Sequence, residues 1–208
     1  MTHFLFIDAS VDDSRTLQAH VNPGTIVHRI SDDVDGVEYI TQTLNAEYTR
    51  SQYDEDRASD TTLSIAAHGT PGVLHLGNAV LSLANLNRYR DRIQQWFSGK
   101  PLSVVRRDRL QLYSCDVAAS AAGQELIHHL CRITYATVYA SSTKMGNAQR
   151  GGNWNFDTLL SWNTRLVPLM GYSQPPAPQS PFDSKVLATY PGILAASTPT
   201  RNTFTGTL

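Results

Sequence analysis

Five short apolar runs are the feature of this 208-residue sequence that most restricts its fold. Taken together these runs are largely apolar with few polar interruptions, whereas strands with one solvent-facing side alternate apolar and polar residues regularly. Consecutive apolar residues are typical of strands that are covered on both faces, as in a parallel sheet between helices. The runs occupy residues 4–7, 25–30, 63–67, 110–113 and 137–141.

Helical periodicity separates these runs. Apolar side chains recur at intervals of three and four in the segments 37–48, 86–97 and 126–133, which is the spacing of one helix face. Aspartates at positions 32–35 precede the first segment and are candidates to cap its start. The alternation of strand and helix predicts an α/β fold, a three-layer αβα sandwich with a mostly parallel central sheet.

The composition changes toward the C-terminus. Seven of the ten prolines lie from Pro168 onward, and charged residues become rare after Ser173. A chain of this length can form one sizeable core. We therefore expect one domain over residues 1–165 and, over residues 166–208, a Pro/Thr-rich tail or linker that packs partly on that domain.

The overall charge argues against some partners. Seventeen basic and eighteen acidic residues leave a net charge of -1, so no global field favours nucleic acid, and we expect no nucleic-acid partner. The apolar run at 4–7 is followed at once by Asp8 and has no basic leader, and no stretch approaches the ~20 apolar residues of a membrane helix. We expect a cytoplasmic protein without membrane insertion, and the oligomeric state stays open.

Two residues whose side chains could take part in catalysis follow neighbouring predicted strands. His68 comes directly after residues 63–67, and Cys115 follows residues 110–113. Active sites gather at the carboxyl ends of parallel strands, and an imidazole can activate a thiol. Gly69 lets its backbone N–H approach a substrate carbonyl, so that the amides of Gly69 and Cys115 are candidates for an oxyanion hole. The helix-forming stretch after Cys115 is expected to lower the thiol pKa.

Each of these residues also has a plain structural interpretation. A single His-Gly at a strand end is more often a loop residue than a catalyst, and a buried cysteine is usually inert packing. The other cysteine, Cys131, lies in an apolar helical stripe and is expected to be a core thiol, although a disulfide with Cys115 stays open. No metal-binding motif is present, so we expect no metal and no cofactor.

The sequence segments around these two residues resemble those of a known protein family. AAHGTPG around His68 and LYSCDVAA around Cys115 lie 47 residues apart, and both are similar to segments of caspase-like (clan CD, CHAT- and caspase-type) cysteine peptidases. Together with FIDASVDD and GGNWNFD, they resemble a bacterial caspase-like domain found at the N-terminus of large repeat-rich surface proteins. The resemblance covers roughly residues 3–160, and it implies a caspase-like sandwich that carries a thiol protease.

This resemblance implies a role for each matched residue. His68 would be the general base, Cys115 the nucleophile, and the amides of Gly69 and Cys115 the oxyanion hole. Some caspase-like peptidases need calcium, for which acidic pairs and clusters at 12–13, 32–33 and 54–56 are candidates. The partner would be a protein or peptide substrate. Leaderless secretion as part of a larger protein would be an alternative to the cytoplasm.

The resemblance also places the pocket for the residue before the cut. Asp8 and Ser10 follow the first strand, Ser141 and Ser142 follow a later one, and Asp116 lies beside the nucleophile. Carboxylates in such a pocket would bind a cation, so cleavage after Arg or Lys is expected. For Asp8 an equally weighted alternative is a turn stabilised by local hydrogen bonds with Ser10.

Three functions therefore remain from the sequence. The first is a cysteine endopeptidase that also processes itself, with Arg50 and Arg57 as candidate cut sites. The second is a non-catalytic, caspase-like binding or structural module at the head of a large surface protein. The third is an unrelated acyl hydrolase or transferase that uses the same pair of residues.

Overall fold

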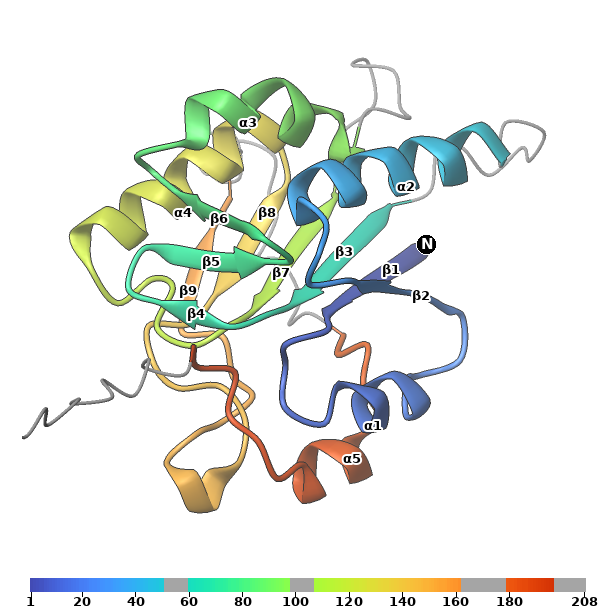
Figure 1. Ribbon diagram of the computed structural model, residues 1–208, viewed down its shortest axis with the longest axis vertical. Helices are drawn as coiled ribbons and strands as arrows, with labels where there is room; N and C mark the ends of the chain where they lie inside the picture. The colour runs from blue at the N-terminus through green and yellow to red at the C-terminus, as the bar shows by residue number, and fades with distance from the viewer. Residues whose placement is uncertain (51–59, 98–106, 162–178, 197–208) are drawn as a thin grey trace, which may run out of the picture.

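A six-stranded sheet forms the centre of the computed structural model, which describes residues 1–50, 60–97, 107–161 and 179–196 (Figure 1). The strand order is β2-β1-β3-β7-β8-β9, in which the first five strands are parallel and β9 is antiparallel to β8. The strands are β1 (Thr2–Asp8), β2 (Thr25–Ile30), β3 (Thr61–Ala66), β7 (Arg109–Tyr113), β8 (Thr137–Ala140) and β9 (Thr158–Leu160). The five predicted strands are confirmed, and so is the α/β class.

A second, three-stranded antiparallel sheet begins directly after His68. It consists of β4 (Gly69–Thr70), β5 (Val73–Leu76) and β6 (Ala79–Ser82). Its second strand, β5, is bonded to the histidine itself, because the backbone N–H of His75 donates to the His68 carbonyl at 3.0 Å. The position of His68 therefore depends on the hairpin as well as on β3.

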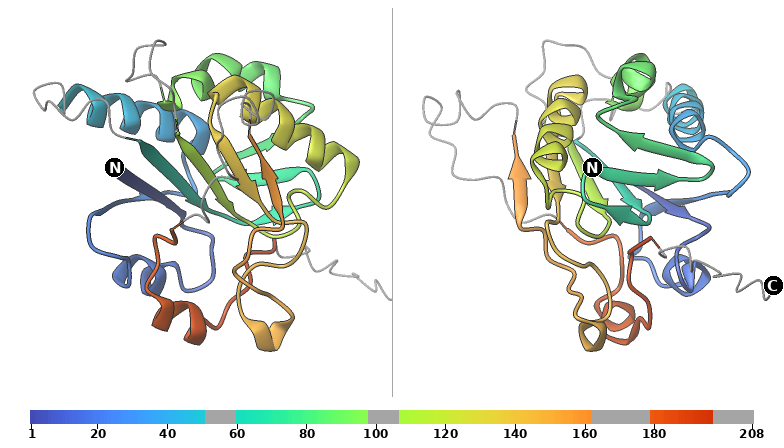
Figure 2. Two further views of the ribbon diagram at one scale, coloured as in Figure 1. Left: turned by 180° about the vertical axis from the view of Figure 1, so that it is seen from behind. Right: turned by 60° about the vertical axis from the view of Figure 1, so that its left-hand side comes forward.

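The larger helices cover one face of the central sheet. These helices are α2 (Gly36–Arg50), α3 (Leu86–Ile93) with the short 3₁₀ helix η3 (Gln94–Phe97), and α4 (Ala121–Thr134). Figure 2 shows them together on one side of the strands. Their apolar faces pack on alternate strand residues such as Phe4 and Phe6. Asp35 accepts from the N–H groups of Val37 and Glu38, which confirms the predicted cap of α2.

The opposite face is covered by two short helices and by the C-terminal segment. The helices are α1 (Ser14–Ala19) and α5 (Ser184–Thr189). The intervening strand residues, among them Leu5 and Ile7 of β1, face this second core. The sheet therefore has helices on both faces, as in a three-layer αβα sandwich.

The segment expected to be a tail contributes to that second core. Phe182, Val186, Tyr190 and Leu194 are at most 4% exposed. Trp154 Nε1 donates to the Leu187 carbonyl at 3.0 Å and so fixes α5 against the loop before β9. The expected boundary between residues 165 and 166 lies outside the described residues, but the described part beyond it is built into the domain.

Candidate active site

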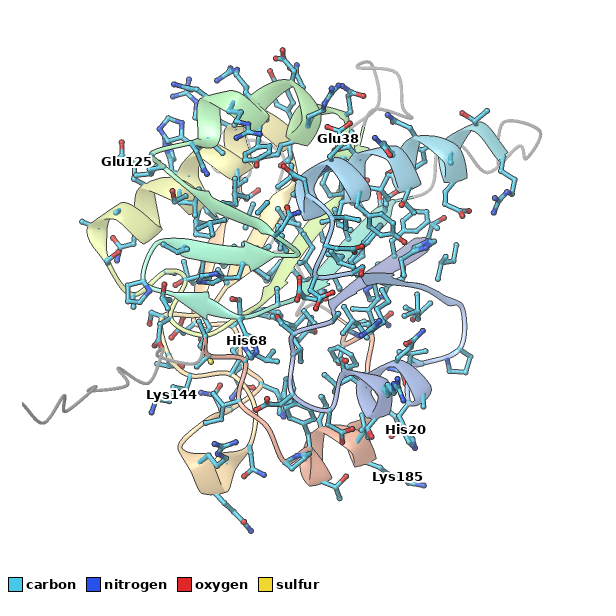
Figure 3. The ribbon with its side chains drawn as sticks, viewed as in Figure 1. His20, Glu38, His68, Glu125, Lys144 and Lys185 are labelled. Atoms are coloured by element: carbon cyan, nitrogen blue, oxygen red, sulfur yellow. The ribbon has the colours of Figure 1, made fainter. Side chains whose placement is uncertain are left out.

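Adjacent parallel strands bring His68 and Cys115 to the same edge of the sheet. Ala66 of β3 is in register with Tyr113 of β7, and the next amide, that of Ala67, donates to the Tyr113 carbonyl at 3.1 Å. His68 is 8% exposed and Cys115 is fully buried. Figure 3 shows His68 at the carboxyl edge of the sheet, near Lys144 of the loop after β8.

The imidazole of His68 has one engaged nitrogen and one unengaged nitrogen. Nε2 lies 2.8 Å from the backbone carbonyl of Ser10, and a carbonyl only accepts, so Nε2 carries the hydrogen. In the neutral ring the lone pair is then on Nδ1. Nδ1 is buried and has no hydrogen-bond partner among the described residues. The loop after β1 therefore selects a tautomer in which Nδ1 can accept a proton.

The Cys115 thiol lies against the loop after β8. Its Sγ accepts from the Met145 N–H at 3.1 Å and lies 3.4 Å from the Met145 carbonyl. Burial raises the pKa of this thiol to about 11, and the Met145 hydrogen bond and the Lys144 charge only partly oppose that rise. With the segment 192–196 in place, the thiol is protonated at neutral pH.

The expected effect of a helix on this thiol is wrong. Helix α4 does not begin beside Cys115 but at Ala121, where Ser120 caps it by accepting from the Gly123 N–H. Residues 115–120 form turns and bends, so the helix does not begin directly after Cys115 as expected. Desolvation is the largest influence on this pKa instead.

The two backbone N–H groups predicted to form an oxyanion hole both donate hydrogen bonds to the same carbonyl oxygen. The N–H groups of Gly69 and Cys115 each donate to the Leu194 carbonyl at 3.1 Å. A Cβ on Gly69 would come within 2.1 Å of Ser114 Oγ, so only glycine allows this approach. The structure thus brings two donors together beside the histidine and the cysteine.

Residues 192–196 lie extended across this site, a feature that sequence reasoning missed. The Leu194 N–H donates to the Met145 carbonyl, and the Gly192 carbonyl accepts from the Asn147 N–H, both at 2.9 Å. On the other side, the Ala196 N–H donates to the Gly69 carbonyl at 3.4 Å. The run Gly-Ile-Leu-Ala-Ala gave no signal beyond two apolar residues flanked by small ones.

Asp8 is buried in a turn, and its carboxylate is engaged by hydrogen bonds inside the protein. Its carboxylate accepts from the Ser10 N–H at 2.9 Å, from the Ser10 hydroxyl at 2.5 Å and from the Gly77 N–H at 2.6 Å. These bonds match the alternative interpretation of Asp8 as a turn residue. Ser10 acts on the site through its backbone carbonyl, which orients His68.

The other predicted pocket residues also have partners within their loops. Ser141 Oγ donates to the Thr143 carbonyl, and the N–H and hydroxyl of Ser142 both donate to Asp157 at 2.7 Å. Partial burial alone would raise the Asp157 pKa, but the bonds from Ser142 outweigh it and lower the pKa. Asp116 adopts a left-handed φ of 56°, and its N–H donates to the Thr143 carbonyl, so it turns the chain after the nucleophile position.

An open cleft of about 380 Å³ adjoins the histidine. It is lined by Ser10, Asp12, His68, Lys144, Arg150, Ile193, Ala195 and Ala196. A larger hollow of about 730 Å³ lies near the amino ends of β1 and β2 and has neither His68 nor Cys115 in its wall. The smaller cleft is therefore the one with candidate chemistry.

The described residues show neither a metal-binding group nor a disulfide bond. No group of three or more His, Cys, Asp or Glu side chains among them could hold a metal ion. The acidic cluster at 54–56 and Arg57 lie outside the described residues. Cys115 and Cys131 are both free and buried, so the predicted core position of Cys131 is confirmed. No helix in the described ranges is long and apolar enough to cross a membrane.

The fold and the site together define an α/β domain that presents an imidazole, a thiol and two convergent amides at the carboxyl edge of a parallel sheet. Residues 4–194 match the family described as a domain of unknown function (DUF4347), and the chain belongs to this family. No curated protein matches the chain. The family match ends at Leu194, the residue whose carbonyl the two amides bind.

Proposed function

We propose that this domain is a caspase-like cysteine endopeptidase in which Cys115 is the nucleophile and His68 the general base. The observation that carries the proposal is the pair of N–H groups, of Gly69 and Cys115, aimed at one peptide carbonyl. Two donors on one acyl oxygen are what a tetrahedral intermediate needs, because the negative charge of acyl transfer develops there.

The mechanism follows from the donors and the base. His68 Nδ1 takes the proton of the Cys115 thiol, and the thiolate attacks the peptide carbonyl carbon. The two amides stabilise the oxyanion, and the imidazolium gives its proton to the departing amine. Water, deprotonated by His68, then hydrolyses the thioester and restores the thiol. Ser10 supports each step because its carbonyl holds Nε2–H and keeps the reactive lone pair on Nδ1.

A cleavage preference for Arg or Lys loses its main support. That preference depended on Asp8 and Asp116 as carboxylates in the pocket. Three hydrogen bonds inside the protein already engage Asp8, and Asp116 turns the chain after Cys115. A carboxylate with that many donors needs no substrate cation. The proposed peptidase activity therefore does not include a basic specificity.

The rival proposal is a non-catalytic binding module. The protonated, buried thiol favours it, because a reactive cysteine is normally a partly exposed thiolate. The free Nδ1 of His68 and the convergent amides favour the enzyme. An acyl hydrolase or transferase would share the dyad, and a panel of ester substrates beside the peptides would reveal it.

Peptide hydrolysis by matched variants tests the proposal. The wild type should cleave a library of fluorogenic peptides, and Cys115→Ala and His68→Ala should each lose at least about 10³-fold in rate. Cys131→Ala is the control, since Cys131 is also a free, buried cysteine whose pKa burial raises to about 11. Equal activity in Cys115→Ala and Cys131→Ala would exclude the mechanism. No hydrolysis of any peptide or ester by the wild type would favour the binding module.

A further inference from the structure

The chain's own segment 192–196 is bound as a peptide substrate would be. It pairs with residues 145–147 through the Leu194 N–H and the Gly192 carbonyl, and it offers the Leu194 carbonyl to the two amides. Main-chain hydrogen bonds of this kind recognise any extended peptide, as in other cases of strand addition. The site has therefore already selected one peptide bond of this chain, the bond between Leu194 and Ala195.

Two glycines show that the groove is built for this segment. A Cβ on Gly146 would lie 2.5 Å from the Gly192 carbonyl oxygen, and a Cβ on Gly192 would lie 2.8 Å from Asp12 Cβ. A side chain at position 146 would push the segment away from the strand-like pairing at residues 145–147, and one at position 192 would collide with Tyr190 and Asp12. Gly146 therefore lets the groove approach the segment backbone, and Gly192 lets the segment pass Tyr190 and Asp12.

The side chain before the bond fills an apolar subsite. Leu194 is fully buried and belongs to the second core cluster. That cluster also contains Ala66, Tyr113 and Met145, so the side chain lies in an apolar environment. Burying a leucine side chain in such an apolar environment gains about 1.5–3 kcal/mol, whereas a charged side chain there would have to be desolvated. The pocket accordingly selects a leucine-like residue before the cut.

We infer that the domain processes itself by hydrolysing the Leu194–Ala195 peptide bond and that its primary specificity is for leucine-like residues. This inference rests on the proposed function. Cys115 Sγ forms a thioester with the Leu194 carbonyl carbon as the C–N bond to Ala195 breaks, and His68 passes the thiol proton to the Ala195 nitrogen. Water then releases the Leu194 carboxylate and regenerates the thiol, so that one water is consumed for each bond.

Processing would also change access to the nucleophile. The uncut segment covers Cys115, which is fully buried, and burial is the main reason for its raised pKa. The cleft beside His68 is lined by Ala195 and Ala196, the residues that follow the bond. Cleavage detaches residues 195–208 from this chain and so opens the leaving-group side of the site to other peptides.

Intact-mass measurement of the full chain tests the inference. Wild-type protein should lose the mass of residues 195–208 with a rate that does not depend on protein concentration, and Cys115→Ala should keep its full mass. Ala195→Pro should also stay intact, because a proline ring on the leaving nitrogen blocks the cut while Leu194 remains extended. Leu194→Met should be cut within about 10-fold of the wild-type rate, whereas Leu194→Asp should slow at least 100-fold. Leu159→Asp is the matched control, since Leu159 is 45% exposed.

The outcomes separate this inference from the proposed function. A cut elsewhere, for example after Arg50, would overturn the inference and keep the peptidase. An intact wild type whose Leu194→Asp variant hydrolyses added peptides would also overturn it, since the segment would then be an inhibitor only. If neither the wild type nor any variant cleaves itself or a peptide, both proposals are wrong. If Leu159→Asp also loses cleavage, the loss in Leu194→Asp is not specific to the subsite. Ala195→Pro then decides, because release of residues 195–208 from that variant would overturn the inference.

Discussion

At the scale of single residues, position 69 is the one at which the site most strictly requires a glycine. Its N–H is one of two donors to the Leu194 carbonyl, and a Cβ there would lie 2.1 Å from Ser114 Oγ and 2.6 Å from the Cys115 carbonyl oxygen. Those neighbours are a short side chain and a backbone atom, so neither can move aside without shifting the donors. The His-Gly sequence is therefore a geometric constraint on the site.

We expect Gly69→Ala to lower kcat/KM for peptides by about 10²–10³, the effect of losing one oxyanion donor. Gly24→Ala is the control, because Gly24 has no heavy atom within 4 Å of its would-be Cβ and a φ of 84°. It should lose roughly 1 kcal/mol of stability to backbone strain and keep its activity. Wild-type turnover in Gly69→Ala would contradict the assignment of this amide.

The sequence predicted which residues meet here but not how they meet. Strand-end positions suffice to bring His68, Gly69 and Cys115 together, since neighbouring parallel strands share an edge. The covering of Cys115 by Leu194, almost 80 residues later in the chain, depends on tertiary packing that no local pattern encodes. The same packing reversed the expected direction of the Cys115 pKa shift.

At the scale of elements, a buried polar chain joins the central strands. His3 of β1 lies 2.8 Å from Ser64 Oγ of β3, and Ser64 donates to Gln111 of β7 at 2.7 Å. Because the Ser64 hydrogen is used, His3 Nε2 must donate. Gln111 Nε2 then donates to the Gln179 carbonyl at 3.1 Å and links the strands to the start of the C-terminal segment.

This chain of bonds predicts acid sensitivity. Burial, and secondarily the Arg109 charge, lowers the His3 pKa from 6.5 to about 4. Unfolded protein therefore binds this proton first, so stability is complete above pH 6.5 and is lost as the pH falls toward 4. Urea titrations across this range should show a loss of about 1–3 kcal/mol that is smaller in His3→Gln. The loss should not vanish, because burial also lowers the His28 pKa; equal losses in both proteins would contradict the role of His3.

The elements that the sequence missed are the short ones. β9 has three residues, and α1 and α5 have six each, too few to show a period of two or 3.6. Long elements such as α2 and α4 were predicted because their apolar stripes extend over several turns. Short elements are stabilised by tertiary contacts instead, as Trp154 stabilises α5 through the Leu187 carbonyl.

At the scale of the whole molecule, the C-terminal segment is a structural layer. Proline-rich composition predicted a tail, because prolines and few charges are typical of linkers. The widely spaced apolar residues Phe182, Val186, Tyr190 and Leu194 are nevertheless buried against the sheet. The Asn22 side chain donates to the carbonyls of Ser180 and Phe182, so the segment is also hydrogen-bonded to the loop before β2.

This arrangement predicts that Phe182→Ala will destabilise the whole domain. The Phe182 ring is 1% exposed and packs edge-to-face on Tyr113 with centroids 5.4 Å apart, so its removal leaves a cavity under β7. We expect the free energy of unfolding to fall by about 3–5 kcal/mol in urea denaturation, whereas the exposed Lys185→Ala should change it by less than about 0.5 kcal/mol. A small effect of Phe182→Ala would mean that the segment is a detachable tail after all. Because Tyr113 precedes Cys115 by two residues, the same variant should also slow peptide hydrolysis, and an unchanged rate would show that the site tolerates movement of this layer.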